Sequence, residues 1–390
     1  GDPNSKLTYT SPSTKWVRDA SGIYVSGTTL RCDHLADGTA LGLLIEGQRT
    51  NQVANSTMQG AVDGSSGTIP TGWNTSGGPG LTRTLTTITV NGVECLAWRF
   101  SGTTGDTALA ISWTTAALVT AASGDTWTNS AFMALTAGAM TNINTFRLAL
   151  CERTSGGSLV ATKYGSDIKG SLTSTLARFT QTSTLDGGGT VARVQPRIEI
   201  AYSSGVAVDF TVLIGWPQCE LASFASSPIR TTTAAVTRAA DDITLATSLI
   251  PYSATVGTLI ATFRVPSVSG IQTAVSLDDN TDNERITMRA SSGSMATSVV
   301  DGGVSQAFLS SGTLSANTLM KSAVAWAADD FAYCANGGTV QTDASATLPT
   351  MTGLRFGKRS IASDHLFGHL QTIKYLPRRA SNSELQAFTA

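Results

Sequence analysis

The chain has 390 residues, which is too many for one ordinary domain and enough for two or three. Charged residues make up only 14% of it, against a usual share of about 25%, and the formal net charge is -1. The sequence forms no basic patch, which argues against nucleic acid as a partner. It also contains no apolar run near the roughly 20 residues that a membrane helix needs, so we expect no membrane insertion.

The five cysteines show neither a metal-binding nor a disulfide pattern. Their number is odd, and no CxxC motif or Cys/His cluster with zinc spacing is present. We therefore expect all five thiols to be reduced, as in a protein that folds in bacterial cytoplasm. The chain opens with GDPNS, without Met, and we interpret these first residues as a remnant of cloning. The cysteines are Cys32, Cys95, Cys151, Cys219 and Cys334.

Residues 1–50 are too few to form a domain of their own. This N-terminal arm nevertheless carries apolar side chains, including Trp16, Ile23 and Ile45. Because so short a segment cannot bury them within itself, we expect the arm to pack on a neighbouring domain or on another chain.

Residues 51–228 show the period-two alternation of β-strands. Leu96, Trp98 and Phe100 share one face of a run, and short Gly/Ser/Asp/Asn clusters separate this run from the next. Strands separated by turns predict an antiparallel sandwich rather than βαβ units. The clearest alternating run places Val206, Val208, Phe210, Val212, Ile214 and Trp216 on one face.

A second sandwich is predicted for residues 245–390. The segment 229–244 is rich in Thr and Ala and lacks alternation, so we interpret it as a linker. Alternation resumes at Leu259, and Asn336-Gly337 marks a hairpin because both residues tolerate positive φ. The chain closes with a capping box that starts at Ser381, which predicts one short helix over 382–388. The expected fold class is therefore all-β, with two antiparallel sandwiches and a short N-terminal arm.

Several blocks of this sequence resemble bacteriophage tail-fibre or head-fibre proteins. The motif GLLIEGQRTN at 42–51 is similar to one found near the start of such proteins, and ASFASSPIRTTTAAVTRAADDI at 222–243 is similar to the segment after their first sandwich. The block GHLQTIKYLPRRASNSELQAFTA at 368–390 resembles their concanavalin-A-like, laminin-G-like module. The first sandwich shows a jelly-roll, carbohydrate-binding-module pattern. The resemblance implies a receptor-binding virion protein, and it implies no catalytic residue.

The sequence contains no recognisable catalytic motif. Glycan-cleaving enzymes on concanavalin-like sandwiches use a pair of carboxylates, but the usual ExDxxE pattern is absent and each Glu stands alone. No G-x-S-x-G elbow accompanies the three histidines, His34, His365 and His369. We therefore expect no enzyme, although a carboxylate pair assembled from distant strands stays open.

The segment 278–284 resembles half of a calcium loop. Asp278, Asn280 and Asp282 offer oxygen ligands at alternate positions, but the turn lacks Gly and no distal bidentate Glu follows. The alternative is a polar hairpin tip whose side chains cap their own backbone. Calcium is the only cofactor that the sequence leaves open.

Tryptophan is the natural platform for a sugar ring, because sugars stack on exposed aromatic faces. Most of the seven tryptophans lie in phase with apolar neighbours and are expected in the cores. Trp73 differs, since it follows the turn-rich IPTG segment. It either packs at the end of the sandwich or binds sugar. We take Trp73, Asn74 and Trp113 as candidate ligand-binding residues.

Three functions remain in order of preference. The first is a non-catalytic virion protein, expected to be a homotrimer, that binds host surface polysaccharide and other virion proteins. The second is a purely structural decoration module, and the third is a polysaccharide depolymerase or deacetylase. Fold resemblance indicates architecture better than ligand, so the sequence does not identify the sugar.

Overall fold

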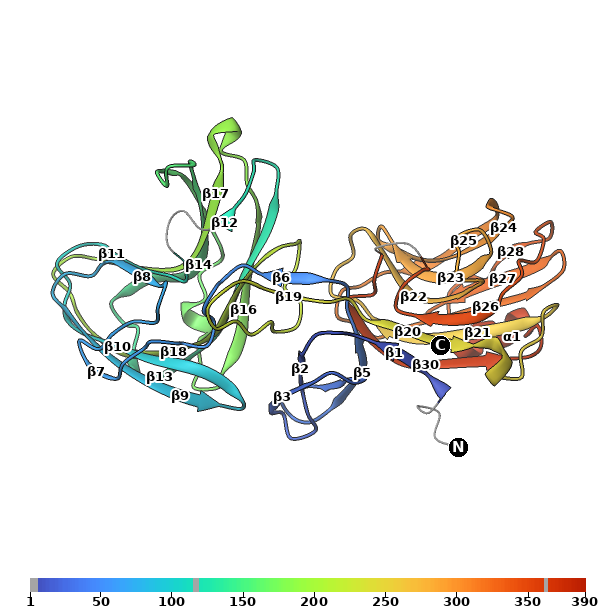
Figure 1. Ribbon diagram of the computed structural model, residues 1–390, viewed down its shortest axis with the longest axis horizontal. Helices are drawn as coiled ribbons and strands as arrows, with labels where there is room; N and C mark the ends of the chain where they lie inside the picture. Colours follow the sequence, from blue (N-terminus) through green and yellow to red (C-terminus); the bar gives the residue numbers. More distant parts are fainter. Residues whose placement is uncertain (1–5, 115–118, 361–363) are drawn as a thin grey trace. The chain divides into compact units, whose positions relative to one another are not determined.

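A computed structural model describes residues 6–114, 119–360 and 364–390, and the chain divides into two compact units. One unit is Arg49–Arg238, and the other combines Gly1–Gln48 with Ala239–Ala390. Every strand pairing in the described residues is antiparallel, as the all-β prediction requires (Figure 1). None of the described helices is long and apolar enough to cross a membrane.

The unit 49–238 is a sandwich of two sheets, which form its two layers in Figure 1. One sheet has the order β16 (Ala177–Thr184), β13 (Thr126–Ala139), β18 (Ala207–Leu221), β10 (Val93–Thr103), β9 (Leu81–Val90) and β7 (Gly64–Ser65). The other has the order β15 (Leu159–Tyr164), β14 (Ile143–Arg153), β17 (Arg193–Tyr202), β11 (Ala108–Ser112) and β8 (Asn74–Gly77), with β12 (Val119–Thr120) also on β17. A separate ladder joins β6 (Arg49–Asn51) to β19 (Val236–Arg238).

Alternation builds the core of this sandwich. Leu96, Trp98 and Phe100 all point inward from β10, and each has no exposed surface. Trp216 departs from the predicted pattern: it lies outside the main core, packs edge-on against Phe132 at 6.1 Å and donates its indole N–H to a carboxylate. The reason is a register shift beside β13 and a φ of 37° at Trp216, which reverse the inward and outward positions along β18.

The second unit is also a sandwich, built from two seven-stranded sheets. One has the order β1 (Thr8–Thr10), β20 (Asp242–Ala246), β29 (Gly353–Phe356), β22 (Ile271–Asp278), β23 (Arg285–Ser291), β24 (Ser294–Asp301) and β25 (Val304–Thr313). The other has the order β28 (Gln341–Asp343), β27 (Asp330–Ala335), β26 (Met320–Ala327), β21 (Gly257–Arg264), β30 (Gly368–Leu376), β5 (Ala40–Ile45) and β4 (Cys32–His34). A hairpin of β2 (Lys15–Arg18) and β3 (Tyr24–Gly27) also belongs to this unit.

The N-terminal arm is part of the second sandwich, which corrects the expected domain boundaries. Strand β5 pairs with β30, and β1 pairs with β20, so the sandwich uses strands from both ends of the chain. Residues 1–50 are therefore not a separate segment, and the expected linker 229–244 contains β19 and most of β20. Ile45 is fully buried in the core of this unit. The sandwich thus buries only part of the apolar arm, because Ile23 and Val25 stay 41% and 39% exposed, so the reason for expecting a second chain remains.

A buried ionic cluster ties the arm to the start of β20. Asp241 accepts hydrogen bonds from Lys15, from Arg31 at 2.9 Å and from the Tyr9 hydroxyl at 2.9 Å. It also accepts from the backbone N–H of Glu46 at 2.8 Å. The charged side chains of this cluster are at most 3% exposed, so the arm supplies both of the buried cations that neutralise Asp241.

The predicted terminal helix is present as α1 (Asn382–Thr389), the only α-helix in the described residues. Ser381 and Glu384 form the expected reciprocal capping box. Leu385 and Phe388 pack against a patch of small side chains on the outward face of β26 and β27. The helix therefore covers the β26 and β27 part of that face, and Ile260 of β21 belongs to the same cluster.

Candidate functional site

The structure places two of the three predicted sugar-binding residues in the core. Trp73 is 5% exposed and Trp113 is 1% exposed, and their rings meet edge to face with centroids 5.0 Å apart. Each indole N–H is bonded inside the sandwich: Trp73 donates to the Asn55 carbonyl at 2.8 Å and Trp113 to Asn129 Oδ1 at 3.0 Å. For Trp73 the structure agrees with packing at the end of the sandwich, which the sequence left open, and Trp113 is buried beside it. Only Asn74, at the start of β8, is exposed.

The core role of Trp73 can be tested by replacing it with Phe. This variant keeps an aromatic face but loses ring volume and the bond to Asn55, so the free energy of unfolding should fall by about 1–2 kcal/mol. Urea unfolding of the two proteins measures the difference. An unchanged stability, combined with weaker glycan binding, would restore the sugar-platform interpretation.

The predicted calcium ligands face arginines instead of a cation site. Asp278 is 2% exposed, lies 3.7 Å from Arg355 Nε, and has its pKa raised by burial. Asn280 accepts from Arg355 at 2.9 Å, and Asp282 pairs with Arg359 at 3.4 Å. In the part of the chain that the structure describes, no group of three His, Cys, Asp or Glu is placed to hold a metal ion. Asn280 N–H and Thr281 N–H donate to neighbouring Asp side chains, which agrees with the polar hairpin tip.

All five cysteines are free, and four of them are buried. Burial raises the pKa of Cys95 to about 12 and also raises the pKa of Cys151 and Cys219. Buried thiols with raised pKa values carry little thiolate at neutral pH, so they are not nucleophiles.

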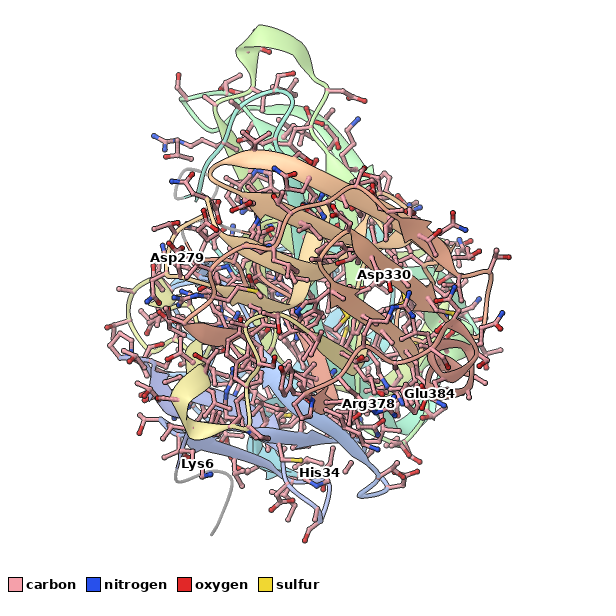
Figure 2. All side chains as sticks on the ribbon, turned by 90° about the vertical axis from the view of Figure 1, so that its right-hand side faces the viewer. Lys6, His34, Asp279, Asp330, Arg378 and Glu384 are labelled. Atoms are coloured by element: carbon pink, nitrogen blue, oxygen red, sulfur yellow. The ribbon has the colours of Figure 1, made fainter. Side chains whose placement is uncertain are left out.

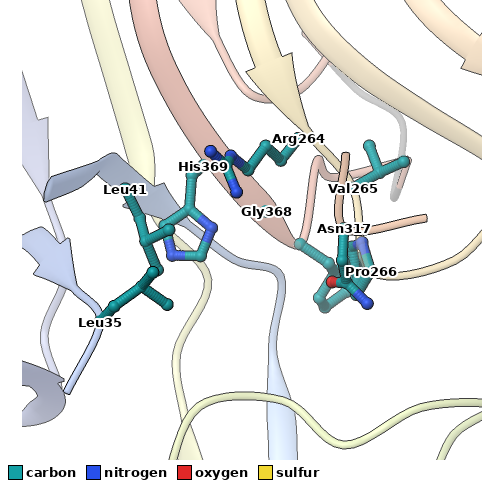
Figure 3. Close-up of a pocket in the computed structure, with 9 residues that line it drawn as sticks. Leu35, Leu41, Arg264, Val265, Pro266, Asn317, Gly368 and His369 are labelled. Atoms are coloured by element: carbon teal, nitrogen blue, oxygen red, sulfur yellow. The ribbon is translucent and has the colours of Figure 1, made fainter. Parts of the chain in front are cut away.

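An apolar pocket of about 270 Å³ lies in the second unit, where Figure 3 shows the ring of His369 beside Leu35 and Leu41. His369 Nε2 is 2.9 Å from Asp33 Oδ2, which is an orienting pair of the kind found in catalytic sites. The residues given above as lining this pocket include no Ser, Thr or Cys beside the pair.

The strongest concentration of functional side chains lies on the outward face of β14 and β17. Apolar residues of these strands, such as Phe146 and Ile198, point into the core, and the alternate positions point outward. Because the two strands pair antiparallel, the outward residues of one stand opposite those of the other. We call this surface the basic face, and its charged residues are Arg147, Arg153, Arg193, Arg197 and Glu199.

The centre of the basic face is a connected polar cluster. Glu199 accepts from Arg197 at 2.5 Å and lies 3.7 Å from Arg147 Nη2. The Arg147 guanidinium lies 3.7 Å from the centroid of the Tyr164 ring, which is 45% exposed. Burial, followed by the hydrogen bond to Glu199, raises the pKa of Tyr164, so its hydroxyl stays protonated at neutral pH. Guanidinium groups, a carboxylate and an aromatic ring are thus held in fixed positions at the surface.

One register row carries this polar surface across five strands. Asn74 on β8 is opposite Ser112 on β11, which is opposite Arg197 on β17. Arg197 is opposite Ala149 on β14, and Ala149 is opposite Tyr164 on β15. At the usual strand spacing the row is roughly 19 Å long. Two small residues, Ser112 and Ala149, separate Asn74, Arg197 and Tyr164 along the row, and they are 7% and 0% exposed.

Part of this site had a visible sequence signal that motif-based reasoning missed. In 193–200, RVQPRIEI, Arg and other polar residues alternate strictly with apolar ones. This pattern indicates a strand with one charged face. It does not indicate that β14, β15 and β8 lie beside that strand in the same sheet.

Comparisons with known proteins give remote structural likenesses only. Neither the protein-family models nor the curated proteins contain a match. Similar solved structures include the CBM40 of the Ruminococcus gnavus IT-sialidase bound to α2,3-sialyllactose (18% identity, TM-score 0.31), which covers 35% of this chain and 84% of that chain. They also include the tripod from the baseplate of bacteriophage Tuc2009 (12% identity, TM-score 0.30), which covers 80% of this chain and 99% of that chain. Domains LG4-5 of the mouse laminin α1 chain match at 9% identity and TM-score 0.25, and the match covers 66% of this chain and 85% of that chain. TM-scores this low carry no argument, so the fold described above rests on the structure itself.

Proposed function

We propose that this protein is a non-catalytic adhesion protein of a phage particle, and that it binds host surface glycan through the basic face. The observation that carries the proposal is the row from Asn74 to Tyr164, with Arg147, Arg197 and Glu199 at its centre. The phage origin and the assembly into a virion rest on the sequence resemblance.

The side chains of the basic face suit a sugar chain. Arg, Glu, Asn and Tyr offer both donors and acceptors to hydroxyl groups, and the exposed ring of Tyr164 offers an apolar surface to a sugar. Four arginines against one glutamate make the face positive in a chain whose net charge is -1. Because guanidinium forks donate paired hydrogen bonds to carboxylates, the proposed ligand is an acidic glycan.

Binding without hydrolysis is supported by the number of carboxylates. Hydrolysis of a glycosidic bond uses two carboxyl groups about 5–10 Å apart. Among the outward positions of β14 and β17, Glu199 is the only carboxylate, and two arginines flank it. The alternative of a purely structural module predicts no glycan binding at all.

The test replaces Arg197 with alanine. The variant should bind an acidic polysaccharide about 10- to 100-fold more weakly in calorimetry, since a hydrogen bond to a charged group contributes about 1.5–3 kcal/mol. Raising the salt concentration should also weaken binding of the unmodified protein.

The matched control is Arg99→Ala. Arg99 forms an exposed pair with Asp209 on the other sheet of the same unit, so its loss should leave affinity unchanged. Equal weakening by both substitutions would argue against the basic face. If a glycan array and host polysaccharide give no binding to the unmodified protein, the structural-module function is correct instead.

A further inference from the structure

The second unit carries a groove on the outward face of its α1-bearing sheet. The groove lies on β21 and β30, next to the part of the face that α1 covers. Its floor consists of outward residues of these two strands, and Phe388 of α1 forms part of its wall. The cavity volume is about 510 Å³, within the usual range of small-ligand sites. The lining residues are Ile260, Thr262, Lys321, Thr372, Lys374, Leu376, Arg378 and Phe388.

The charged residues that line the groove are all positive. Three of its eight residues are cations and none is acidic. Arg378 is bonded by two contacts of 2.9 and 2.7 Å to Glu384, and the two side chains lie next to each other in Figure 2. Lys321 contacts the backbone oxygen of Ala390, whereas Lys374 has no hydrogen bond or ion pair with the described residues. At least one ammonium group is therefore available to a ligand.

The groove also has the polar and apolar surfaces that a sugar ring needs. Thr262 and Thr372 stand opposite each other on paired strands and present hydroxyl groups as donors and acceptors. Leu376 and Phe388, which are partly exposed, provide apolar surface for the C–H faces of a ring, and Ile260 is 8% exposed beneath them. A compact anion such as free phosphate would use the lysines but would leave this apolar part of the groove unfilled.

We propose that this groove is a second carbohydrate site, which binds a short acidic stretch of a polysaccharide with its carboxylate at Lys374. It lies wholly within the second unit and is separate from the basic face of the first. One chain then engages a repetitive acidic polysaccharide at two sites. Two weak sites on one molecule gain avidity through the effective concentration of the second.

The experiment uses the full chain and a tetrameric oligogalacturonate as the probe, with its carboxyl-reduced form as the neutral counterpart. In Arg147→Ala/Arg197→Ala protein the basic face is disabled, and calorimetry should still detect binding of the acidic probe. Adding Lys374→Ala should weaken this remaining binding about tenfold. Adding Thr372→Trp, which fills the groove without removing a charge, should weaken it at least as much.

The matched control is Lys6→Ala, an exposed lysine of the same unit outside the groove. It should leave the remaining binding unchanged. If the Arg147→Ala/Arg197→Ala protein binds nothing, or if Thr372→Trp has no effect, the groove is not a site. Equal affinity for the neutral probe would overturn its acidic preference. If the groove does not bind the probe but the basic face still does, the proposed function is unaffected. The two proposals can therefore be rejected independently.

Discussion

Replacing Asp241 with alanine should lower the free energy of unfolding of the second unit by about 3–5 kcal/mol. Asp241 is the shared acceptor for Lys15, Arg31 and the Tyr9 hydroxyl, all contributed by the N-terminal arm. Alanine would remove the carboxylate that the buried cations Lys15 and Arg31 share, and Glu46 lies 3.5 Å from Arg31. Uncompensated charge in the interior costs far more than the original ion pairs contributed.

The control for this variant is Asp209→Ala. Asp209 also pairs with an arginine, but the two side chains are 58% and 51% exposed. An exposed pair contributes about 0–1 kcal/mol, so this variant should unfold almost as the unmodified protein does. Guanidinium chloride unfolding followed by circular dichroism measures both. If Asp241→Ala costs less than about 1 kcal/mol, the cluster is not what holds the arm.

Deleting residues 1–48 should prevent the second unit from folding to a stable state. The deletion removes β5 and β4 from the edge of the sheet beside β30, and removes β1 from the edge of β20. It also removes the buried side chains of Val17, Leu44 and Ile45, each contributing about 1.5–3 kcal/mol. With the loss of both cations from Asp241, the total approaches the 5–15 kcal/mol that stabilises a typical domain.

The complementary fragment 49–238 should fold alone, because its core lies within its own two sheets. Thermal unfolding should therefore show one cooperative transition for this fragment and no second transition for the chain that lacks residues 1–48. Two normal transitions in the truncated chain would show that the arm only decorates the second sandwich.

The sequence predicted the local structure of this protein well, because alternation and capping act over a few residues. Strand positions in β10 and the helix after Ser381 follow directly from those patterns. The pairing of β5 with β30 joins residues more than 300 positions apart, and no local pattern identifies such a partner. For this reason the sequence did not show that residues 1–48 belong to the second unit.

The candidate site could be predicted only in part. Asn74 was identified from its turn-rich context and does lie on the row that ends at Tyr164. For its neighbour Trp73 the sequence left packing and sugar binding open, although consecutive residues of extended chain point to opposite sides. The charged alternation of 193–200 marks an outward face, but its meaning depends on Arg147 and Tyr164 from other strands.

The ladder between β6 and β19 places the entry and exit of the first sandwich side by side. Arg49 stands directly opposite Arg238, at the two ends of the 49–238 segment. An inserted domain with adjacent ends can be replaced by another of the same kind while the interrupted domain keeps all its own strands. Recombination at these two points would exchange the whole segment 49–238, and with it the proposed glycan specificity. The sandwich that receives the insertion would keep its own sequence while the inserted sandwich changes.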